Sequence, residues 1–199
     1  TLTNINHPAE LALHGYLERV VNGKAGFSKE TVIQISRDIQ DAILRQFGRG
    51  KRDQFRLRMS NVGRPYCQLW FEKNKPEAAL PKPTTFIMNM LLGDIIEAIF
   101  KGLLKEAEVK YFDSEKVTLS TRNAEIDGTF DLVIDGAVDD IKSASDWSYK
   151  NKFTSYEVLK DNDAFGYVGQ LAGYAKATGQ NPGGWWVINK PNGQFKYVP

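Results

Sequence analysis

Cysteine and histidine, which often hold metal ions in proteins, are almost absent from this chain of 199 residues. The single cysteine, Cys67, excludes a disulfide within the chain and any zinc or iron–sulfur site that needs several cysteines of one chain. His7 and His14, the only histidines, have no acidic or cysteine partner at ligand spacing, which favours surface or structural roles. This cysteine usage predicts a reduced, cytoplasmic setting.

Long apolar runs and a large net charge are also lacking. No run approaches the ~18 apolar residues of a membrane span, and the start TLTNINHPAE has no charged segment followed by an apolar core. We therefore expect a soluble, unexported protein without a membrane partner. The net charge of +2 indicates no partner by its total, and the distribution of charge along the chain is more informative.

A predicted hairpin dominates the sequence between residues 125 and 145, which reads EIDGTFDLVIDGAVDDIKSAS. Two β-rich runs, residues 129–134 and 137–143, flank the dipeptide Asp135-Gly136, and this arrangement is typical of a two-residue hairpin turn. Counting outward from the turn places Asp131 directly opposite Asp140. The hairpin is therefore expected to carry two opposed carboxylates on one face.

Opposed like charges destabilise a sheet unless something offsets them. Lys142 points to the same face, two residues beyond Asp140, so one explanation is a solvated face with Lys142 as a neutralising neighbour. The other is a divalent cation such as Mg²⁺ or Mn²⁺, which prefers oxygen ligands. The spacing leaves both open. Asp127, which shares the face, and Asp139, which points away, serve as comparison positions.

Apolar periodicity predicts four helices and a second hairpin. The longer N-terminal helix is expected to begin after the cap residue Ser28, and a strand is expected before the central hairpin. We expect a helical region over residues 1–55 packed on a core of residues 56–199. The predicted helices cover residues 9–21, 29–47, 85–107 and 164–177, the leading strand covers 109–121, and the second hairpin pairs 184–189 with 194–198.

A basic strip precedes the core. Between residues 45 and 64 the sequence holds seven basic residues against the single acid Asp53. The strip is either a solvated connection or a phosphate-contacting surface, because clustered arginine is the electrostatic mark of nucleic-acid binding. Ser60-Asn61 is expected to cap a helix that begins near Val62. The basic residues are Arg45, Arg49, Lys51, Arg52, Arg56, Arg58 and Arg64.

Two predicted helices carry polar pairs. Glu97 and Lys101 are four residues apart in the 85–107 helix, the spacing of an ordinary surface ion pair worth a few tenths of a kcal/mol, roughly. Gly93 lies one turn earlier, and a mid-helix glycine often marks the close approach of another backbone. Gln170 and Tyr174 share a face of the 164–177 helix. Alone, neither pair identifies a function.

Taken in order, these motifs resemble the PD-(D/E)XK nuclease superfamily. The likeness is closest to its RecB-like and lambda-exonuclease-like branch, which includes many phage-encoded exonucleases and the CRISPR-associated exonucleases. It covers about residues 56–186, with a G-x-x-D at Gly128–Asp131, D-I-K at Asp140–Lys142 and Q-x-x-x-Y at Gln170–Tyr174. The resemblance implies an α/β (α+β) fold with a restriction-endonuclease-like core, a central mixed β-sheet flanked by helices and an N-terminal helical extension.

The resemblance also implies roles for individual residues. Lys142 would position or activate the attacking water, and Gln170 and Tyr174 would support the site and contact the DNA backbone. The cofactor would be one or two Mg²⁺ or Mn²⁺ ions, and no iron–sulfur cluster is expected because the other cluster cysteines are missing. The implied metal ligands are Asp131, Asp140, Glu97 and the carbonyl of Ile141.

The function so implied is a metal-dependent deoxyribonuclease, foremost an exonuclease of DNA recombination, replication or repair. A structure-specific or restriction-like endonuclease stays open, as does a non-catalytic nucleic-acid-binding protein on a nuclease scaffold. The partner is DNA, with a homo-oligomer or a recombination protein left open, and the compartment is the cytoplasm, the host's for a phage-encoded protein. The residues expected at the DNA are Ser60, Arg64, Arg58, Arg56, Lys51, Arg52, Ser143 and Trp147.

Overall fold

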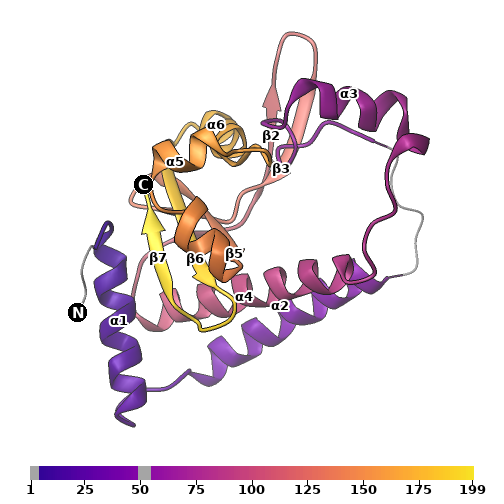
Figure 1. Ribbon diagram of the computed structural model, residues 1–199. Helices are drawn as coiled ribbons and strands as arrows, with labels where there is room; N and C mark the ends of the chain where they lie inside the picture. Colours follow the sequence, from indigo (N-terminus) through magenta and orange to yellow (C-terminus); the bar gives the residue numbers. More distant parts are fainter. Residues whose placement is uncertain (1–4, 49–54) are drawn as a thin grey trace.

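A computed structural model describes residues 5–48 and 55–199 of the protein. Along the chain a run of helices comes first, followed by a run of strands, further helices and a last pair of strands (Figure 1). Within the described residues, no helix is long and apolar enough to cross a membrane. The elements are α1 (Pro8–Val21), α2 (Lys29–Phe47), α3 (Tyr66–Asn74), η1 (Pro76–Ala78), α4 (Phe86–Glu106), β1 (Phe112–Asp113), β2 (Lys116–Ser120), β3 (Glu125–Thr129), β4 (Leu132–Ile134), β5 (Ala137–Ala144), η2 (Ser148–Lys152), α5 (Tyr156–Asp161), α6 (Tyr167–Thr178), β6 (Asn181–Asn189) and β7 (Phe195–Val198).

The centre of the fold is a five-stranded mixed sheet with the strand order β1-β4-β5-β6-β7. Strands β5 and β6 run parallel, and the other neighbouring pairs are antiparallel. The helix α6 lies in the crossover between the parallel strands β5 and β6, as parallel pairing requires a long connection. The predicted α+β class with a mixed sheet flanked by helices is confirmed.

Each face of the sheet buries its own hydrophobic cluster, because alternate strand residues point to opposite faces. On one face Val138, Ala144 and Val187 pack with Leu171 and Tyr174 of α6. The other cluster places strand residues against α1 and α4, and it comprises Ala9, Leu13, Tyr16, Phe100, Leu104, Ala107, Leu132, Ile134, Ile141, Trp186, Ile188 and Tyr197. The sheet is therefore covered on both faces.

The two long helices α2 and α4 lie side by side at the bottom of Figure 1. The Ser28 hydroxyl accepts a hydrogen bond from the Thr31 N–H, so the predicted N-cap of α2 is confirmed. A Cβ at Gly102 of α4 would lie 2.5 Å from Cδ1 of Ile35, and the glycine therefore lets the helices approach closely. This close packing holds α4, and with it Glu97, in place.

The predicted central hairpin is confirmed with its register. Leu132 pairs with Asp139, Val133 with Val138 and Ile134 with Ala137. The turn residues Asp135 and Gly136 have φ values of 49° and 77°, the left-handed region that a two-residue hairpin turn of type I′ requires. The second hairpin, β6 with β7, is also confirmed.

Several predicted elements differ from the structure. The expected strand over 109–121 is two short strands, β1 in the central sheet and β2 in a separate two-stranded sheet with β3. No helix begins near Val62, where the chain makes turns, and α3 begins after Pro65 because a proline has no N–H to continue a helix begun earlier. The helix expected from residue 164 starts at Tyr167, since Gly166 adopts a φ of 77°.

Helices also form where none was predicted. The segment after β5 contains the helical turn η2. The short helix α5 was not predicted, although Ser155 caps it through a hydrogen bond from the Val158 N–H. Both are about one to two turns long, which is too short for a hydrophobic period to identify them.

Candidate functional site

The hairpin brings Asp131, Asp140 and Lys142 together. Asp131 is the residue before β4, next to the pair Leu132–Asp139, and its carboxyl group lies close enough to that of Asp140 in β5 for each to affect the pKa of the other. The Lys142 ammonium lies 2.5 Å from Oδ2 of Asp140. The Asp140 side chain is only 3% exposed and that of Lys142 is 19% exposed, so this ion pair is largely removed from water. The expected cluster of two carboxylates and one ammonium is present in the structure.

The cluster holds more negative charge than one lysine neutralises. Burial, followed by repulsion from Asp140, raises the pKa of Asp131 to about 7. Burial also raises the pKa of Asp140, against the opposing effect of Lys142. Burial would lower the pKa of Lys142, but the Asp140 and Asp131 carboxylates outweigh it and raise that pKa. A cation bound beside these carboxylates would relieve the repulsion.

Just before β4 begins, the side chain of Asp131 takes the place of a backbone hydrogen-bond acceptor for β5. Its Oδ2 accepts a hydrogen bond of 2.7 Å from the backbone N–H of Ile141. A residue that pairs across an antiparallel ladder directs its N–H and its C=O to the same side. The carbonyl of Ile141 therefore lies on the same edge of β5 as the Asp131 carboxylate, where the sequence-based resemblance places a metal ligand.

Glu97 reaches the neighbourhood of this cluster from α4. Burial and the charge of Asp131 raise the pKa of its carboxyl, and Glu97 in turn raises that of Asp140. Glu97 is also ion-paired to Lys101 at 2.9 Å, one turn further along the helix. The prediction of an ordinary surface pair is wrong, because the Lys101 side chain is only 9% exposed.

Lys101 connects three elements around the site. Its ammonium lies 3.1 Å from the Asp113 carboxylate of β1 and 3.2 Å from the Ser114 hydroxyl. Burial opposes the charged form, but Glu97, Asp113 and Asp131 outweigh burial and raise the lysine's pKa. Sequence reasoning missed this role, which depends on β1 packing beside α4.

Helix α6 adds the Gln170–Tyr174 pair. Burial raises the pKa of Tyr174 most, Asp131 and Asp140 raise it further, and the neighbouring Gln170 side chain acts in the opposite direction. A Cβ at Gly128 would lie 2.7 Å from Cε1 of Tyr174, so this glycine lets β3 approach α6. The glycine of the G-x-x-D motif thus has a packing role.

Tyr167, at the start of α6, was not predicted as a site residue. The centre of its ring lies 5.0 Å from the Lys142 ammonium, a cation–π distance. Burial raises its pKa most, while Lys142 and Arg64 act in the opposite direction. The only sequence signal was its position three residues before Gln170, on the same side of a helix.

The expected DNA-contacting residues fall into separate groups. Arg56, Arg58 and Ser60 line a cavity of about 540 Å³ together with Lys116 and Tyr174. Arg64 lies elsewhere, within electrostatic reach of Tyr167, and its guanidinium is paired with Glu72 at 3.2 Å. Lys51 and Arg52, like Arg49 of the basic strip, lie outside the described residues.

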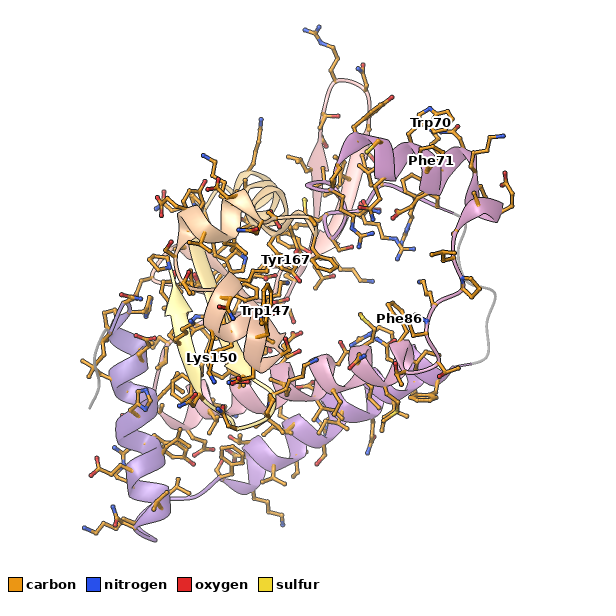
Figure 2. The ribbon with its side chains drawn as sticks, in the orientation of Figure 1. Trp70, Phe71, Phe86, Trp147, Lys150 and Tyr167 are labelled. Atoms are coloured by element: carbon orange, nitrogen blue, oxygen red, sulfur yellow. The ribbon has the colours of Figure 1, made fainter. Side chains whose placement is uncertain are left out.

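The remaining predicted residues differ in their exposure. Ser143 lies beside α4, where a Cβ at Gly93 would be 3.4 Å from its Oγ. Trp147 is 68% exposed, and in Figure 2 it lies on the same side of the core as Tyr167. Arg45, the first residue of the basic strip, is ion-paired with Asp94 of α4 at 3.0 Å and supports the α2–α4 contact.

The two comparison aspartates have structural surroundings of their own. Asp139 points away from the cluster, as predicted, and accepts hydrogen bonds from the Gly184 N–H, the Trp186 indole and the Tyr197 hydroxyl. Asp127 lies in the two-stranded sheet, where it accepts a hydrogen bond from Thr118. Asp139 is buried, whereas Asp127 is exposed and suits a control for stability, although it lines the cavity of Arg56 and Arg58 and is therefore not neutral for DNA binding.

The oxygen atoms of the site determine whether it fits a divalent ion. Across residues 5–48 and 55–199, no three His, Cys, Asp or Glu side chains are close enough together to form a metal cluster on their own. Mg²⁺, however, usually binds through one or two carboxylates together with waters and substrate phosphates. The carboxyl groups of Asp131 and Asp140, whose ionised forms repel each other, fit that type of site together with the Ile141 carbonyl on the same edge.

Comparisons with known proteins add little. No family model matches the sequence, and no curated protein matches it. Among solved structures, the crystal structure of SSO0001 is similar with 14% sequence identity and a TM-score of 0.44, over 86% of this chain and 78% of that one.

Proposed function

We propose that the protein is a Mg²⁺- or Mn²⁺-dependent deoxyribonuclease, with exonuclease activity as the foremost form. The observation that carries the proposal is the pair of opposed carboxylates, Asp131 and Asp140, with the Lys142 ammonium 2.5 Å from Asp140. Repulsion between the two carboxylates disfavours the folded state, and a bound divalent cation would offset that repulsion. The resemblance of the surrounding motifs to the PD-(D/E)XK superfamily supports the same assignment.

Each residue has a role that follows from its surroundings. Asp131, Asp140 and the Ile141 carbonyl would hold the ion, which when bound would neutralise charge on the phosphate and lower the pKa of a bound water. Lys142, kept charged by its carboxylate neighbours, would hold the water or the phosphate by its ammonium protons. Glu97 is ion-paired with Lys101, so its carboxylate would bind the metal ion through a bridging water, or directly after leaving Lys101.

Gln170 and Tyr174 would fix the far side of the site. The Gln170 side chain lies near enough to Tyr174 to lower the pKa of its hydroxyl and would help to orient it, and the tyrosine packs against β3 where Gly128 allows contact. The cavity beside Tyr174, lined by Arg56 and Arg58, offers positive charge for a DNA backbone that continues past the site.

The proposal is tested by incubating purified protein with end-labelled DNA in the presence of Mg²⁺ or Mn²⁺. We expect degradation that stops when a chelator is added and that is lost in Asp140→Asn and Lys142→Met. The exposed Asp161→Asn variant, at the end of α5, is the matched control and is expected to retain activity. Full activity of the Asp140 and Lys142 variants would refute the assignment of the site.

Assays on the same purified protein distinguish an exonuclease from an endonuclease and from a non-catalytic DNA-binding protein. Closed circular DNA distinguishes an exonuclease, which leaves it intact, from an endonuclease, which opens it. A non-catalytic DNA-binding protein would bind DNA yet show no heat of Mg²⁺ or Mn²⁺ binding by calorimetry. The presence of both aspartates and the lysine in one cluster favours the enzyme over a binding protein.

A further inference from the structure

An exposed aromatic side chain stands next to the candidate site. Phe165, just before α6, is 57% exposed, and its ring stacks on that of Tyr167 with 5.6 Å between ring centres and 16° between ring planes. Tyr167 in turn lies over the Lys142 ammonium. The two rings therefore lead from the charged cluster toward solvent.

Positive charge accompanies the rings. The Lys152 ammonium lies 4.6 Å from the centre of the Tyr167 ring and 4.7 Å from that of Phe165. Arg64 acts electrostatically on Tyr167 from another segment. An aromatic face with cations at its side is the combination that holds a nucleotide, since the ring stacks on a base and the cation attracts the phosphate.

The segment that carries Phe165 is held in place. The Asp163 carboxylate accepts hydrogen bonds of 2.8 Å from the Tyr167 and Val168 N–H groups. Gly166 has a φ of 77°, and a Cβ there would lie 2.3 Å from the backbone of Gly63, so the two glycines pack directly against each other. A ring on a fixed segment binds with less loss of conformational freedom than one on a flexible loop.

We infer that Phe165, supported by Tyr167 and Lys152, is a base-stacking platform that makes single-stranded DNA the substrate of this site. The inference rests on the proposed nuclease function and adds the class of strand. Every base of a single strand offers its flat face, whereas a duplex offers a free face only at its terminal pair. The platform therefore favours a single strand whose bases can leave the neighbouring stack.

The chain offers a matched control for this platform. Phe71 on α3 is 56% exposed and also contacts another aromatic ring, that of Trp70. In Figure 2, Phe71 and Trp70 lie on α3, well apart from Tyr167. If removal of any exposed phenylalanine weakened DNA binding, Phe71→Ala and Phe165→Ala would weaken it equally.

The test measures binding of the full chain to a short fluorescein-labelled single-stranded oligonucleotide and to the blunt duplex of the same sequence, with a chelator present to prevent cleavage. We expect tighter binding of the single strand, and Phe165→Ala should weaken that binding by about 5- to 150-fold, the usual effect of losing one base-stacking contact. Phe71→Ala should leave it unchanged. Heat denaturation of each variant checks that the fold is retained.

Abasic nucleotides identify the stacking contact itself. An oligonucleotide lacking the base that stacks on Phe165 should bind the wild type more weakly, and the same lesion should have no further effect on Phe165→Ala. An equal effect of the lesion in both proteins, or tighter binding of the duplex by the wild type, would overturn the inference. Calorimetry with Mn²⁺ tests the proposed metal site separately, so a failure of the platform and a failure of the nuclease assignment are distinguishable.

Discussion

Asp131 and Asp140 are chemically alike and stand opposite each other, yet their replacement should change stability in opposite directions. The structure pairs only Asp140 closely with Lys142, at 2.5 Å. Asp131 is held by the Ile141 N–H, a bond that the amide oxygen of asparagine can also accept. We therefore expect Asp131→Asn to stabilise the metal-free protein and Asp140→Asn to destabilise it.

The magnitude for Asp131 follows from its pKa, which the fold raises from 3.8 to about 7. A shift of this size corresponds to about 4 kcal/mol against the ionised, folded state at pH 8. Because the side chain retains contact with solvent and shares its charge with Asp140, we expect about half of that, roughly 2 kcal/mol. For a chain of this length, that is a rise in Tm of about 4–8 °C.

The sign of the pH dependence is determined by the same shift. The folded state keeps a proton on Asp131 between about pH 4 and pH 7, where the unfolded chain has lost it, so stability falls as pH rises through that window and levels off above it. Asp131→Asn removes this contribution, and its stability curve should be flatter over the window. The advantage of the variant should therefore be largest at pH 8 and vanish near pH 4.

Asp140→Asn leaves the Lys142 ammonium in a largely buried position with Asp131 as its remaining carboxylate neighbour. Breaking a buried ion pair costs about 3–5 kcal/mol, and relief of the repulsion between the aspartates offsets part of it, so we expect a net loss of about 1–3 kcal/mol. Urea denaturation with a chelator measures both variants, with Asp127→Asn as the exposed control. Equal destabilisation by the two substitutions would refute the electrostatic reasoning.

Three further outcomes are expected. Adding Mg²⁺ at about ten times its Kd should stabilise the wild type by about 1.4 kcal/mol and leave Asp131→Asn nearly unaffected in a thermal shift assay; an equal shift in both would contradict the site. Lys101→Met should cost about 1–3 kcal/mol by urea denaturation, because Glu97 and Asp113 lose their shared cation. Asp139→Ala should cost about 3 kcal/mol or more, since the Gly184 N–H, the Trp186 indole and the Tyr197 hydroxyl lose their acceptor.

The central hairpin could be predicted from the sequence because its information is local. Asp135-Gly136 fits a turn with two positive φ values, and the alternation of strand side chains then places Asp131, Asp140 and Lys142 on one face. The N-cap of α2 at Ser28 and the length of α4 could also be predicted from local sequence. Patterns of this kind depend on neighbours a few residues apart.

Only the tertiary structure decided what surrounds that hairpin. The ion pair of Glu97 and Lys101 became largely buried because β1 packs beside α4 and supplies Asp113, and Tyr167 came to lie over Lys142 because α6 returns across the sheet. The burial that raises the pKa of Asp131 likewise comes from segments distant in sequence. The sequence by itself determined which side chains the hairpin presents, whereas long-range packing determined their charge environment, because desolvation depends on every segment that covers them.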